Sequence, residues 1–409
     1  MALDVVEPDI SRPPRPSLHE AERTVHALVL LGFSPYLLAF ARRVRSAGIR
    51  VHLIDLVLQP QDFVRRSSAV EPDGITLPWS LVGAPEGLAV ILSFVDQVHA
   101  DALLTTDDFT LIWLGKHRAL FEPRCRLMIP QPAVLEPLLD KSHQIDRARE
   151  CGFDLLPSWR LTCAEAIAAI PDEAFPVVIR PRLADSARPS FKALVIHSRE
   201  DLSRLYASTQ WTLDPLAQPF RLGPNYILHG VRAQSGELLD LRLFKAYRKY
   251  HGYTTSMAPA PLPASLESAA RRFVQAEGLT GPFHFELLGA EADDRLYFLE
   301  INCRLGGTTA KVMQLGYDEP GLLLKAFNLQ APKPLPSLPV YPRATTISLN
   351  LLQALDALRN RSDPLAYPQL PRMRSFFAAL REAAVVHDGL LDVRDLYSWL
   401  WRARKRIKS

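Results

Sequence analysis

Four polar side chains that could do chemistry lie in two short stretches, residues 283–288 (FHFELL) and 297–302 (YFLEIN), which alternate like half-buried β-strands. One face of each strand would be apolar, with the side chains of Phe283, Phe285, Leu287, Tyr297, Leu299 and Ile301. The other face would carry Glu286, Glu300 and Asn302, together with His284. If the turn between the strands centres on Asp293, Glu286 lies directly opposite Glu300, with Cβ atoms about 5 Å apart.

Two carboxylates at that separation repel each other, and without a cation the pKa of one of them would rise toward protonation. A divalent ion removes this conflict. Glu286, Glu300 and Asn302 offer only hard oxygen ligands, which suit Mg²⁺ bridging nucleotide phosphates. Arg304, just beyond, can place a permanent positive charge against a transferring phosphoryl group or an acyl-phosphate. The glycines at 306 and 307 allow close backbone approach. On spacing alone, an ordinary exposed hairpin face is an equal alternative.

The region before residue 139 has the pattern of an open parallel sheet. The predicted strands are residues 26–31, 50–55 and 102–106, and the predicted helices are residues 36–47 and 89–99. Sheets of this kind bind ligands beyond the carboxyl ends of their strands, where we expect Ser34, Asp55, Thr106 and Asp107. A dinucleotide-binding role is disfavoured, because no GxGxxG motif follows the first strand.

After residue 138 the sequence changes from alternating apolar strands and helices to a charged helix, which indicates a second region. Its predicted elements are a charged helix at 140–149, strands at 175–181 and 192–197, a hairpin at 225–244 and a helix at 265–276. The polar residues 182–190 between the first two strands are interpreted as a mobile flap. Residues 331–339 (APKPLPSLP) form a Pro-rich spacer, after which the C-terminal module is not assigned to a fold.

The run EINCRLGG at residues 300–307, preceded by Phe285 and Glu286, resembles the metal-binding signature of the ATP-grasp superfamily, a Glu-x-Asn-x-Arg run followed by small residues. The helix that follows Asp140, up to Gly152 and Pro157, is similar to the start of the family's nucleotide-binding region. Residues 176–181 (PVVIRP) resemble its strand with a phosphate-binding cation. The N-terminal region, ending in residues 103–108 (LLTTDD), is similar to the small domain that precedes the grasp in carbamoyl-phosphate-synthetase-like ligases. The resemblance covers most of the chain.

The resemblance implies a mixed α/β and α+β fold: an N-terminal open parallel α/β domain, an ATP-grasp fold of two α+β subdomains and a small C-terminal extension. We place a mobile Pro-rich arm at residues 1–23 and the N-terminal domain at 24–138. The ATP-grasp nucleotide-binding and catalytic region then covers 139–330, and the spacer with the C-terminal module covers 331–409.

The resemblance also implies roles for individual residues. Magnesium would be held by Glu286, Glu300 and Asn302, and Arg304 would face the γ-phosphate and the acyl-phosphate. The nucleotide would be lined by Lys141 and Arg180, and adenine recognition is assigned to Gln218. Beyond the signature, Lys192 could fold over the phosphates, and Arg242, ranked before Lys245, could project toward the same site. Surface salt bridges or solvated strand ends are the alternatives for these cations.

Three departures from the family pattern affect these roles. Arg180 stands where the family generally has lysine, which keeps the charge and adds a planar fork. The flap from residue 182 to residue 191 lacks the glycines common in the family. Pro219 stands where many members place an acidic residue, and proline removes a backbone donor beside Gln218.

The function implied is an ATP-dependent carboxylate–amine ligase that forms an amide or peptide bond through an acyl-phosphate, with ATP and Mg²⁺ bound. Two alternatives stay open: a biotin-carboxylase-type enzyme that uses bicarbonate, although no biotinyl-acceptor motif is present, and a non-catalytic ATP-binding regulatory or assembly protein. Small carboxylates and amines, including amino acids, are the expected substrates. Unranked candidates for their recognition are Ser34, Asp108, Arg242, His251 and Tyr253.

Composition excludes few other roles. The net charge of +4 comes from 48 basic and 44 acidic residues that are mostly interspersed, so nucleic acid is not an expected partner. Four distant cysteines, at 125, 151, 163 and 303, indicate reduced thiols rather than disulfides or zinc. The apolar run at 27–40 is too short for a membrane span, so we expect a cytoplasmic protein. We also expect a homo-oligomer. Membrane contact is expected only through the basic residues 400–409, if they are not simply a solvated helix end.

Overall fold

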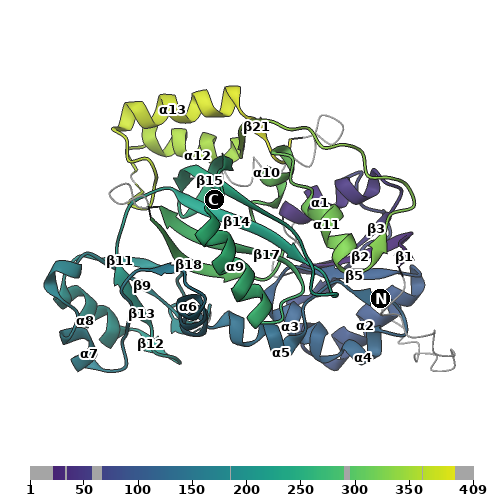
Figure 1. Cartoon of the computed structure of the whole chain (residues 1–409), viewed down its shortest axis with the longest axis horizontal. Coiled ribbons are helices and arrows are strands. Elements are labelled where there is room, and N and C mark those ends of the chain that lie inside the picture. Colours follow the sequence, from purple (N-terminus) through teal and green to yellow (C-terminus); the bar gives the residue numbers. More distant parts are fainter. Residues whose placement is uncertain are drawn as a thin grey trace.

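The computed structural model describes residues 22–32, 35–57, 67–184, 186–289, 295–361 and 363–391. Three sheets frame this part of the chain: a five-stranded, a four-stranded and an eight-stranded sheet. Figure 1 shows the eight-stranded sheet in the centre, the four-stranded sheet in a lobe at the lower left and the five-stranded sheet at the lower right. The arrangement confirms an N-terminal α/β domain followed by α+β elements.

The five-stranded sheet has the order β4-β3-β2-β5-β6, and each neighbouring pair is parallel. Its strands are β2 (Ala27–Leu31), β3 (Arg50–Val57), β4 (Ile75–Pro78), β5 (Ala102–Thr105) and β6 (Arg126–Leu127). Every residue of β2 is buried, because parallel sheets are covered on both faces. The helices of this domain are α1 (Pro35–Arg45), α2 (Pro85–Gln97), α3 (Asp108–Lys116), α4 (Arg118–Phe121) and α5 (Pro132–Leu135).

The four-stranded sheet has the order β11-β9-β13-β8 and is antiparallel. Its strands are β8 (Trp159–Arg160), β9 (Val177–Arg180), β11 (Leu194–Ile196) and β13 (Leu216–Pro219). The helices of this lobe are α7 (Ala164–Ala168) and α8 (Arg199–Ser208). Within the expected flap, β10 (Ala187–Arg188) pairs with β12 (Gln210–Trp211). The flap is therefore anchored to its own lobe at this point.

The eight-stranded sheet has the order β21-β20-β16-β15-β14-β17-β18-β7. Its strands are β7 (Asp154–Leu155), β14 (Asn225–Arg232), β15 (Leu238–Tyr250), β16 (Tyr253–Ala260), β17 (Gly281–Gly289), β18 (Leu296–Asn302), β20 (Ala344–Thr345) and β21 (His387–Asp388). The helices that accompany it are α6 (Lys141–Glu150), α9 (Ala264–Ala276), α10 (Thr309–Gln314), α11 (Glu319–Ala326), α12 (Ile347–Leu358) and α13 (Arg372–Val385).

The β15–β16 hairpin was not expected from the sequence. The strand predicted to stop at residue 244 continues to Tyr250, and a tight turn at His251 and Gly252 leads into β16. Both turn residues have positive φ, 49° and 71°. Glycine tolerates this conformation, but histidine is not a typical turn residue, so the turn was not predicted. The cation- and aromatic-rich residues 245–253 are thus the tip of a hairpin.

The segment after the Pro-rich spacer is part of the central sheet. β20 pairs with β16, and β21 pairs with β20, so both strands extend its edge. Helices α12 and α13 lie together above this edge (Figure 1). At the other end of the described chain, β1 (Arg23–Thr24) pairs in parallel with β19 (Leu329–Gln330). Arg23, which the sequence placed in the arm, therefore belongs to a strand.

Several predictions concern residues outside the described part of the chain: the arm before residue 22, Ser34, the turn around Asp293 and the basic residues 400–409. Among the described helices, none combines the length and apolar character that crossing a bilayer requires. The largest apolar core runs from the face of β2 that bears Val29, through α2 and α3, to the β17–β18 hairpin. The N-terminal domain and the central sheet are thus packed together.

Candidate functional site

The apolar face of β17 is the one that its sequence predicts. Phe283, Phe285 and Leu287 have no exposed surface. The ring of Phe285 lies 5.1 Å from that of Phe153 and 5.2 Å from that of Phe273 in α9, measured between centroids. Because this aromatic core fixes the buried face of β17, Glu286 must project from the opposite face.

The two acidic residues meet across the hairpin. Glu286 pairs with Glu300, and His284 pairs with Asn302, so the register predicted from the sequence is confirmed. The aromatic core of β17 constrains this register, because a slip by one residue would turn the buried face of the strand outward.

A β-bulge interrupts β18 immediately before Glu300. Leu287 pairs with Phe298, whereas the preceding residue of β17 pairs with Glu300, so Leu299 is the extra residue. The predicted common face of Tyr297, Leu299 and Ile301 is therefore wrong. Phe298 joins Ile301 in the aromatic core instead, because the bulge shifts the alternation by one residue.

The bulge brings the site into contact with the four-stranded sheet. Arg180, the last residue of β9, donates from Nη1 to the carbonyl oxygen of Leu299 over 2.9 Å. Its Nη2 donates to Oε2 of Glu300 over 2.5 Å. This guanidinium, assigned to the nucleotide from the sequence, thus links the two sheets and pairs with a predicted metal ligand.

Lys141 approaches the same carboxylate from the start of α6. Burial lowers the pKa of Lys141, and the negative charge of Glu300 partly offsets that effect. Asp140 caps this helix by accepting a 2.8 Å hydrogen bond from the backbone N–H of Ser142. Burial alone would raise the pKa of Asp140, but hydrogen bonds from Arg182 and Ser142 lower it to about 2. The start of the helix is therefore firmly held.

The two glutamates have opposite pKa shifts. Burial and the negative charge of Glu300 raise the pKa of Glu286 to about 7. Burial alone would raise the pKa of Glu300 too, but Arg180 and Lys141 outweigh it, and the pKa is lowered. Glu300 is thus held as a carboxylate, whereas burial and the charge of Glu300 disfavour the ionised form of Glu286. A divalent cation between them would favour ionisation of both.

The donor set fits magnesium. Asn302 directs its amide Nδ2 toward Oε1 of Glu300, at 3.4 Å, which leaves the amide oxygen to ligate a cation. Together with the carboxylates of Glu286 and Glu300, the available ligands are all hard oxygens. The structure thus brings together the three residues that the sequence assigned to the metal.

Arg304 connects the site to the N-terminal domain. Its Nε donates to Oδ1 of Asp108 over 2.7 Å, and its Nη2 donates to Oδ2 over 3.3 Å. Asp108 is the first residue of α3, directly after Asp107, which caps the helix. Burial raises the pKa of Asp107. The segment after the carboxyl end of β5 therefore reaches Arg304, just beyond the β17–β18 hairpin, as expected for an open parallel sheet.

A buried network that the sequence analysis missed supports the loop after Asn302. His229 and Glu319 have no exposed surface, and His229 Nδ1 lies 2.8 Å from Glu319 Oε1. Thr309 donates to Glu319 over 2.5 Å and accepts from the backbone N–H of Gly306 over 3.1 Å. A Cβ at Gly306 would come within 2.4 Å of the His284 ring. The sequence offered one sign of this network, His229, a single histidine within the apolar run of β14.

Lys192, which directly follows the expected flap, contacts the hairpin tip. Its Nζ lies 5.4 Å from the ring centroid of Tyr253, a cation–π geometry. Lys192 also contributes a positive charge that lowers the pKa of Glu286. His251, at the same tip, lies with its Nε2 3.6 Å from Asp356. Of the two unranked candidates at this tip, Tyr253 is thus the one that Lys192 contacts.

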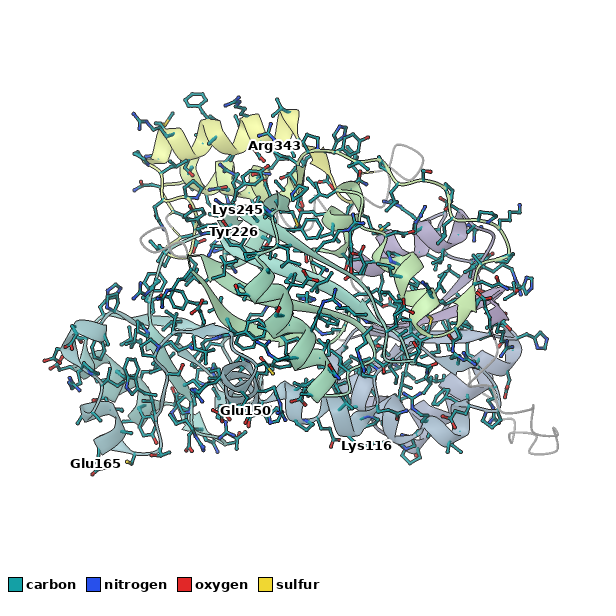
Figure 2. The ribbon with its side chains drawn as sticks, viewed as in Figure 1. Lys116, Glu150, Glu165, Tyr226, Lys245 and Arg343 are labelled. Carbon is teal, nitrogen blue, oxygen red and sulfur yellow. The ribbon has the colours of Figure 1, made fainter. Side chains whose placement is uncertain are left out.

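Arg242 and Lys245 do not reach the carboxylates through any contact among the described residues. Arg242 is half exposed, pairs with Asp240 over 3.0 Å and donates to the carbonyl oxygen of Gly316 over 3.2 Å. Lys245 lies over the ring of Tyr226, 5.6 Å from its centroid, and Figure 2 shows these two side chains together. The cationic roles predicted for them receive no geometric support.

Lys249, four residues after Lys245, interacts electrostatically with Glu286. Its Nζ donates to Oδ1 of Asn225 over 2.7 Å. Burial lowers its pKa to about 8, against an opposing effect of the Glu286 charge. Lys245 and Lys249 are four residues apart, so a period of two places both on the same face of β15, and both are half-buried. Lys249 was missed because the predicted strand stops at residue 244.

Gln218 on β13 is buried, as an adenine-recognising residue would be. Its Nε2 donates to Ser158 Oγ over 2.9 Å, whereas its Oε1 is buried without a hydrogen-bond partner. A buried acceptor of this kind is costly unless a ligand completes it, and the exocyclic amine of adenine is a suitable donor. Pro219, next along the strand, pairs with Val177.

No family model matches this sequence, and no curated protein matches it. Solved structures do. N5-carboxyaminoimidazole synthetase from Staphylococcus aureus, complexed with ADP, has a TM-score of 0.57 at 13% identity, covering 79% of this chain and 82% of that chain. L-amino acid ligase from Bacillus licheniformis has a TM-score of 0.55 at 18% identity, covering 75% and 74%.

A third similar structure is the biotin carboxylase domain of 2-oxoglutarate carboxylase from Hydrogenobacter thermophilus, solved with MgADP, ADP and bicarbonate. It has a TM-score of 0.59 at 15% identity, covering 74% of this chain and 70% of that chain. At such identities the likeness is one of fold. The chain has the ATP-grasp fold, as its EINCRLGG run predicts.

Proposed function

We propose that this chain, built on the ATP-grasp fold, is an ATP-dependent carboxylate–amine ligase that forms an amide or peptide bond. The observation that carries the proposal is the convergence of Glu286, Glu300 and Asn302, with Arg180 bonded to Glu300 over 2.5 Å. The two alternatives left by the sequence, a bicarbonate-dependent carboxylase and a non-catalytic nucleotide-binding protein, are tested by the same experiment.

In the proposed reaction, a carboxylate oxygen of one substrate attacks the γ-phosphorus of ATP, and the bond to the bridging oxygen of ADP breaks. The amine of a second substrate then attacks the acyl carbon of the acyl-phosphate. The amide bond forms, inorganic phosphate leaves, and the amine proton passes to solvent. Bound Mg²⁺ supplies neutralisation of the phosphate charge. No side chain needs to act as a nucleophile.

The residues of the chain would divide this work among them. Glu286, Glu300 and Asn302 would hold the cation, and Arg180 keeps Glu300 ionised so that it can do so. Lys141, from α6, and Lys192, directly after the flap, would neutralise phosphate oxygens. Gln218 would accept a hydrogen bond from the adenine amine. Such fixed charges lower the barrier most effectively where water is excluded.

Amino acids are the substrates that we favour. The Arg304–Asp108 pair places a guanidinium and a carboxylate side by side between the hairpin and the N-terminal domain. A zwitterion is complementary to both groups, with its carboxylate toward Arg304 and its ammonium toward Asp108. The fold likeness to an L-amino acid ligase agrees with this class.

The test is ADP release from MgATP in the presence of pooled and then single amino acids, with mass spectrometry of the products. We expect release that depends on the added amine, together with a product mass equal to two amino acids minus water. Release that depends on bicarbonate instead would identify a carboxylase. Tight MgATP binding without release under any condition would leave the regulatory binding protein.

A further inference from the structure

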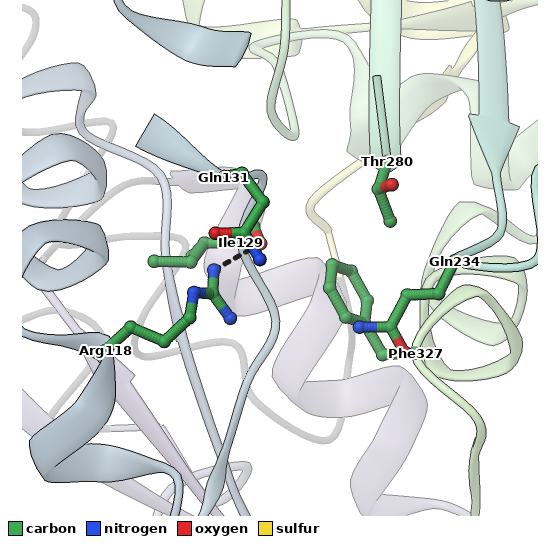
Figure 3. Close-up of a pocket in the computed structure, with 6 residues that line it drawn as sticks. All are labelled: Arg118, Ile129, Gln131, Gln234, Thr280 and Phe327. Carbon is green, nitrogen blue, oxygen red and sulfur yellow. Dashed lines mark hydrogen bonds between the residues drawn. The ribbon is translucent and has the colours of Figure 1, made fainter. Parts of the chain in front are cut away.

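A pocket of about 320 Å³ lies between the N-terminal domain and the central sheet (Figure 3). Its lining residues are Arg118, Ile129, Gln131, Gln234, Thr280 and Phe327. The first three come from α4 and the segment after β6, and the others from the β14–β15 turn, the residue before β17 and the end of α11. The two sides of the pocket thus belong to different parts of the fold. The volume suits a small molecule rather than a nucleotide.

Arg118 brings a positive charge to this pocket. Its Nη2 donates to the carbonyl oxygens of Ile129 and Pro130, over 3.1 and 3.2 Å, and the first of these bonds is drawn in Figure 3. Among the described residues no carboxylate is hydrogen-bonded to it, but the charge of Glu122 raises its pKa and partly offsets the larger effect of burial. Its Nε is buried without a hydrogen-bond partner. A guanidinium so placed favours an anionic ligand, and a carboxylate matches its planar fork.

Three further polar side chains face the same space. Gln131 and Gln234 are exposed, and Thr280 is half-buried. None of their side-chain groups bonds to another described residue, and Figure 3 shows them around the pocket with Arg118. Phe327 and Ile129 add an apolar wall. A few convergent polar groups beside an apolar wall are what small-molecule sites share.

The pocket is separate from the candidate metal site. Thr280 immediately precedes β17, and Glu286 lies six residues further along this extended strand. At about 3.4 Å per residue, the two positions are about 20 Å apart. A molecule in the pocket would therefore not touch the metal ligands, but it would touch the strand that carries one of them and the N-terminal domain at the same time.

We propose that this pocket is a second binding site, for a small organic monocarboxylate with one further hydrogen-bonding group, such as a hydroxy acid. The carboxylate would pair with Arg118, the substituent would bond to the amides of Gln131 and Gln234 or to the Thr280 hydroxyl, and the carbon skeleton would lie against Phe327. The site goes beyond the proposed ligase reaction and does not depend on it.

The test uses radiolabelled lactate as the probe, in equilibrium dialysis with the full chain. Because a ligase site could also bind a carboxylate, the reference protein carries Arg304→Gln, which removes the carboxylate-binding cation there. We expect about one lactate per chain in this reference, and at least tenfold weaker binding when Arg118→Gln is added. Lys116→Gln, which removes an exposed cation two residues away, is the matched control and should leave binding unchanged.

Two exposed positions keep the test independent of folding defects. Gln131→Ala and Gln234→Ala should each weaken lactate binding about threefold, the loss expected for one hydrogen bond. Equal binding with and without Arg118→Gln, an equal loss with Lys116→Gln, or no loss in either glutamine variant would overturn the proposal. Inorganic phosphate that displaces the labelled lactate at a lower concentration than unlabelled lactate does would overturn the carboxylate assignment.

Discussion

Two half-buried arginines in this molecule hold their charge in different ways. Arg180 divides its guanidinium between the carboxylate of Glu300 and the carbonyl oxygen of Leu299. Arg118 donates to the carbonyl oxygens of Ile129 and Pro130, and burial lowers its pKa more than the charge of Glu122 raises it. A guanidinium that is bonded to a carboxylate lowers the pKa of that carboxylate, whereas one that is bonded only to neutral carbonyl oxygens can still bind an anion directly. The groups that are bonded to a buried arginine thus indicate whether its site is suited to a cation, as at Arg180, or to an anion, as at Arg118.

The largest effect that we expect comes from removing the carboxylate on which Arg180 acts. Glu300→Ala should lower ADP formation about a thousandfold or more, because a metal ligand and the partner of Arg180 are lost together. Circular dichroism and thermal unfolding should show an intact fold. Glu267→Ala, at an exposed ion pair on α9, is the control. An unchanged rate for Glu300→Ala would remove the metal assignment and with it the contrast between the two arginines.

A third buried cation sharpens the comparison through stability. The ammonium group of Lys249 donates to Asn225 and lies 5.9 Å from the ring centroid of Tyr367, and its folded pKa of about 8 is below the ordinary lysine value of 10.5. Between pH 8 and pH 10.5 the unfolded chain therefore binds more protons than the folded chain, and stability rises with pH. The destabilising effect of the Lys249 charge is full below pH 8 and vanishes by about pH 10.5.

Lys249→Met should accordingly raise the free energy of unfolding by up to about 3 kcal/mol at pH 7, and by much less at pH 10.5. Urea unfolding at both pH values measures this. The matched change at the exposed Lys116 should stay within about 0.5 kcal/mol at either pH. A gain that does not depend on pH would mean that packing, rather than the charge, is responsible.

Substitution of Arg304, which makes two bonds to Asp108 of the N-terminal domain, should have the next largest effect. Arg304→Lys keeps the charge but cannot maintain both bonds to Asp108, so we expect kcat for ADP formation to fall about thirtyfold. Asp108→Asn, which leaves the guanidinium in place, should mainly raise KM for the amino acid. If both variants change only KM for MgATP, the amino-acid assignment of this pair is wrong.

The smallest effect tests the comparison directly. Arg180→Lys restores the residue that the ATP-grasp family generally has and loses one of the two contacts, so KM for MgATP should rise about tenfold. Arg118→Lys should leave that KM unchanged, because Arg118 is far from the metal ligands. Equal effects of the two substitutions would mean that the two arginines do not serve different sites.

The sequence predicted the parts of the site that depend on local alternation and on a signature run. Phe283, Phe285 and Leu287 fix the face of β17, and the pairing of Glu286 with Glu300 follows from it. The bulge at Leu299 was missed, because an extra residue in a strand is decided by the pairing with its neighbour and leaves no compositional mark.

The remaining misses also arise from tertiary pairing. Lys249 was missed because the predicted strand stops at residue 244, whereas β15 continues to Tyr250, paired with β16. The bond between His229 and Glu319 joins residues 90 positions apart, which no local pattern records. Arg180 was identified as a cation for the nucleotide, but its bond to Glu300 depends on how two sheets approach each other. Residue types were therefore easier to predict than their partners.

The pairing of β1 with β19 bears on how the molecule could be divided. Arg23 and Thr24 lie beside Leu329 and Gln330, and Arg126 in the first domain donates to the carbonyl oxygen of Phe327 over 2.6 Å. A proteolytic or engineered fragment that begins at residue 139 would lose both attachments and uncover the apolar side chains shared with the first domain. We expect such a fragment to aggregate, so the part of the chain after residue 138 cannot be studied as an autonomous unit.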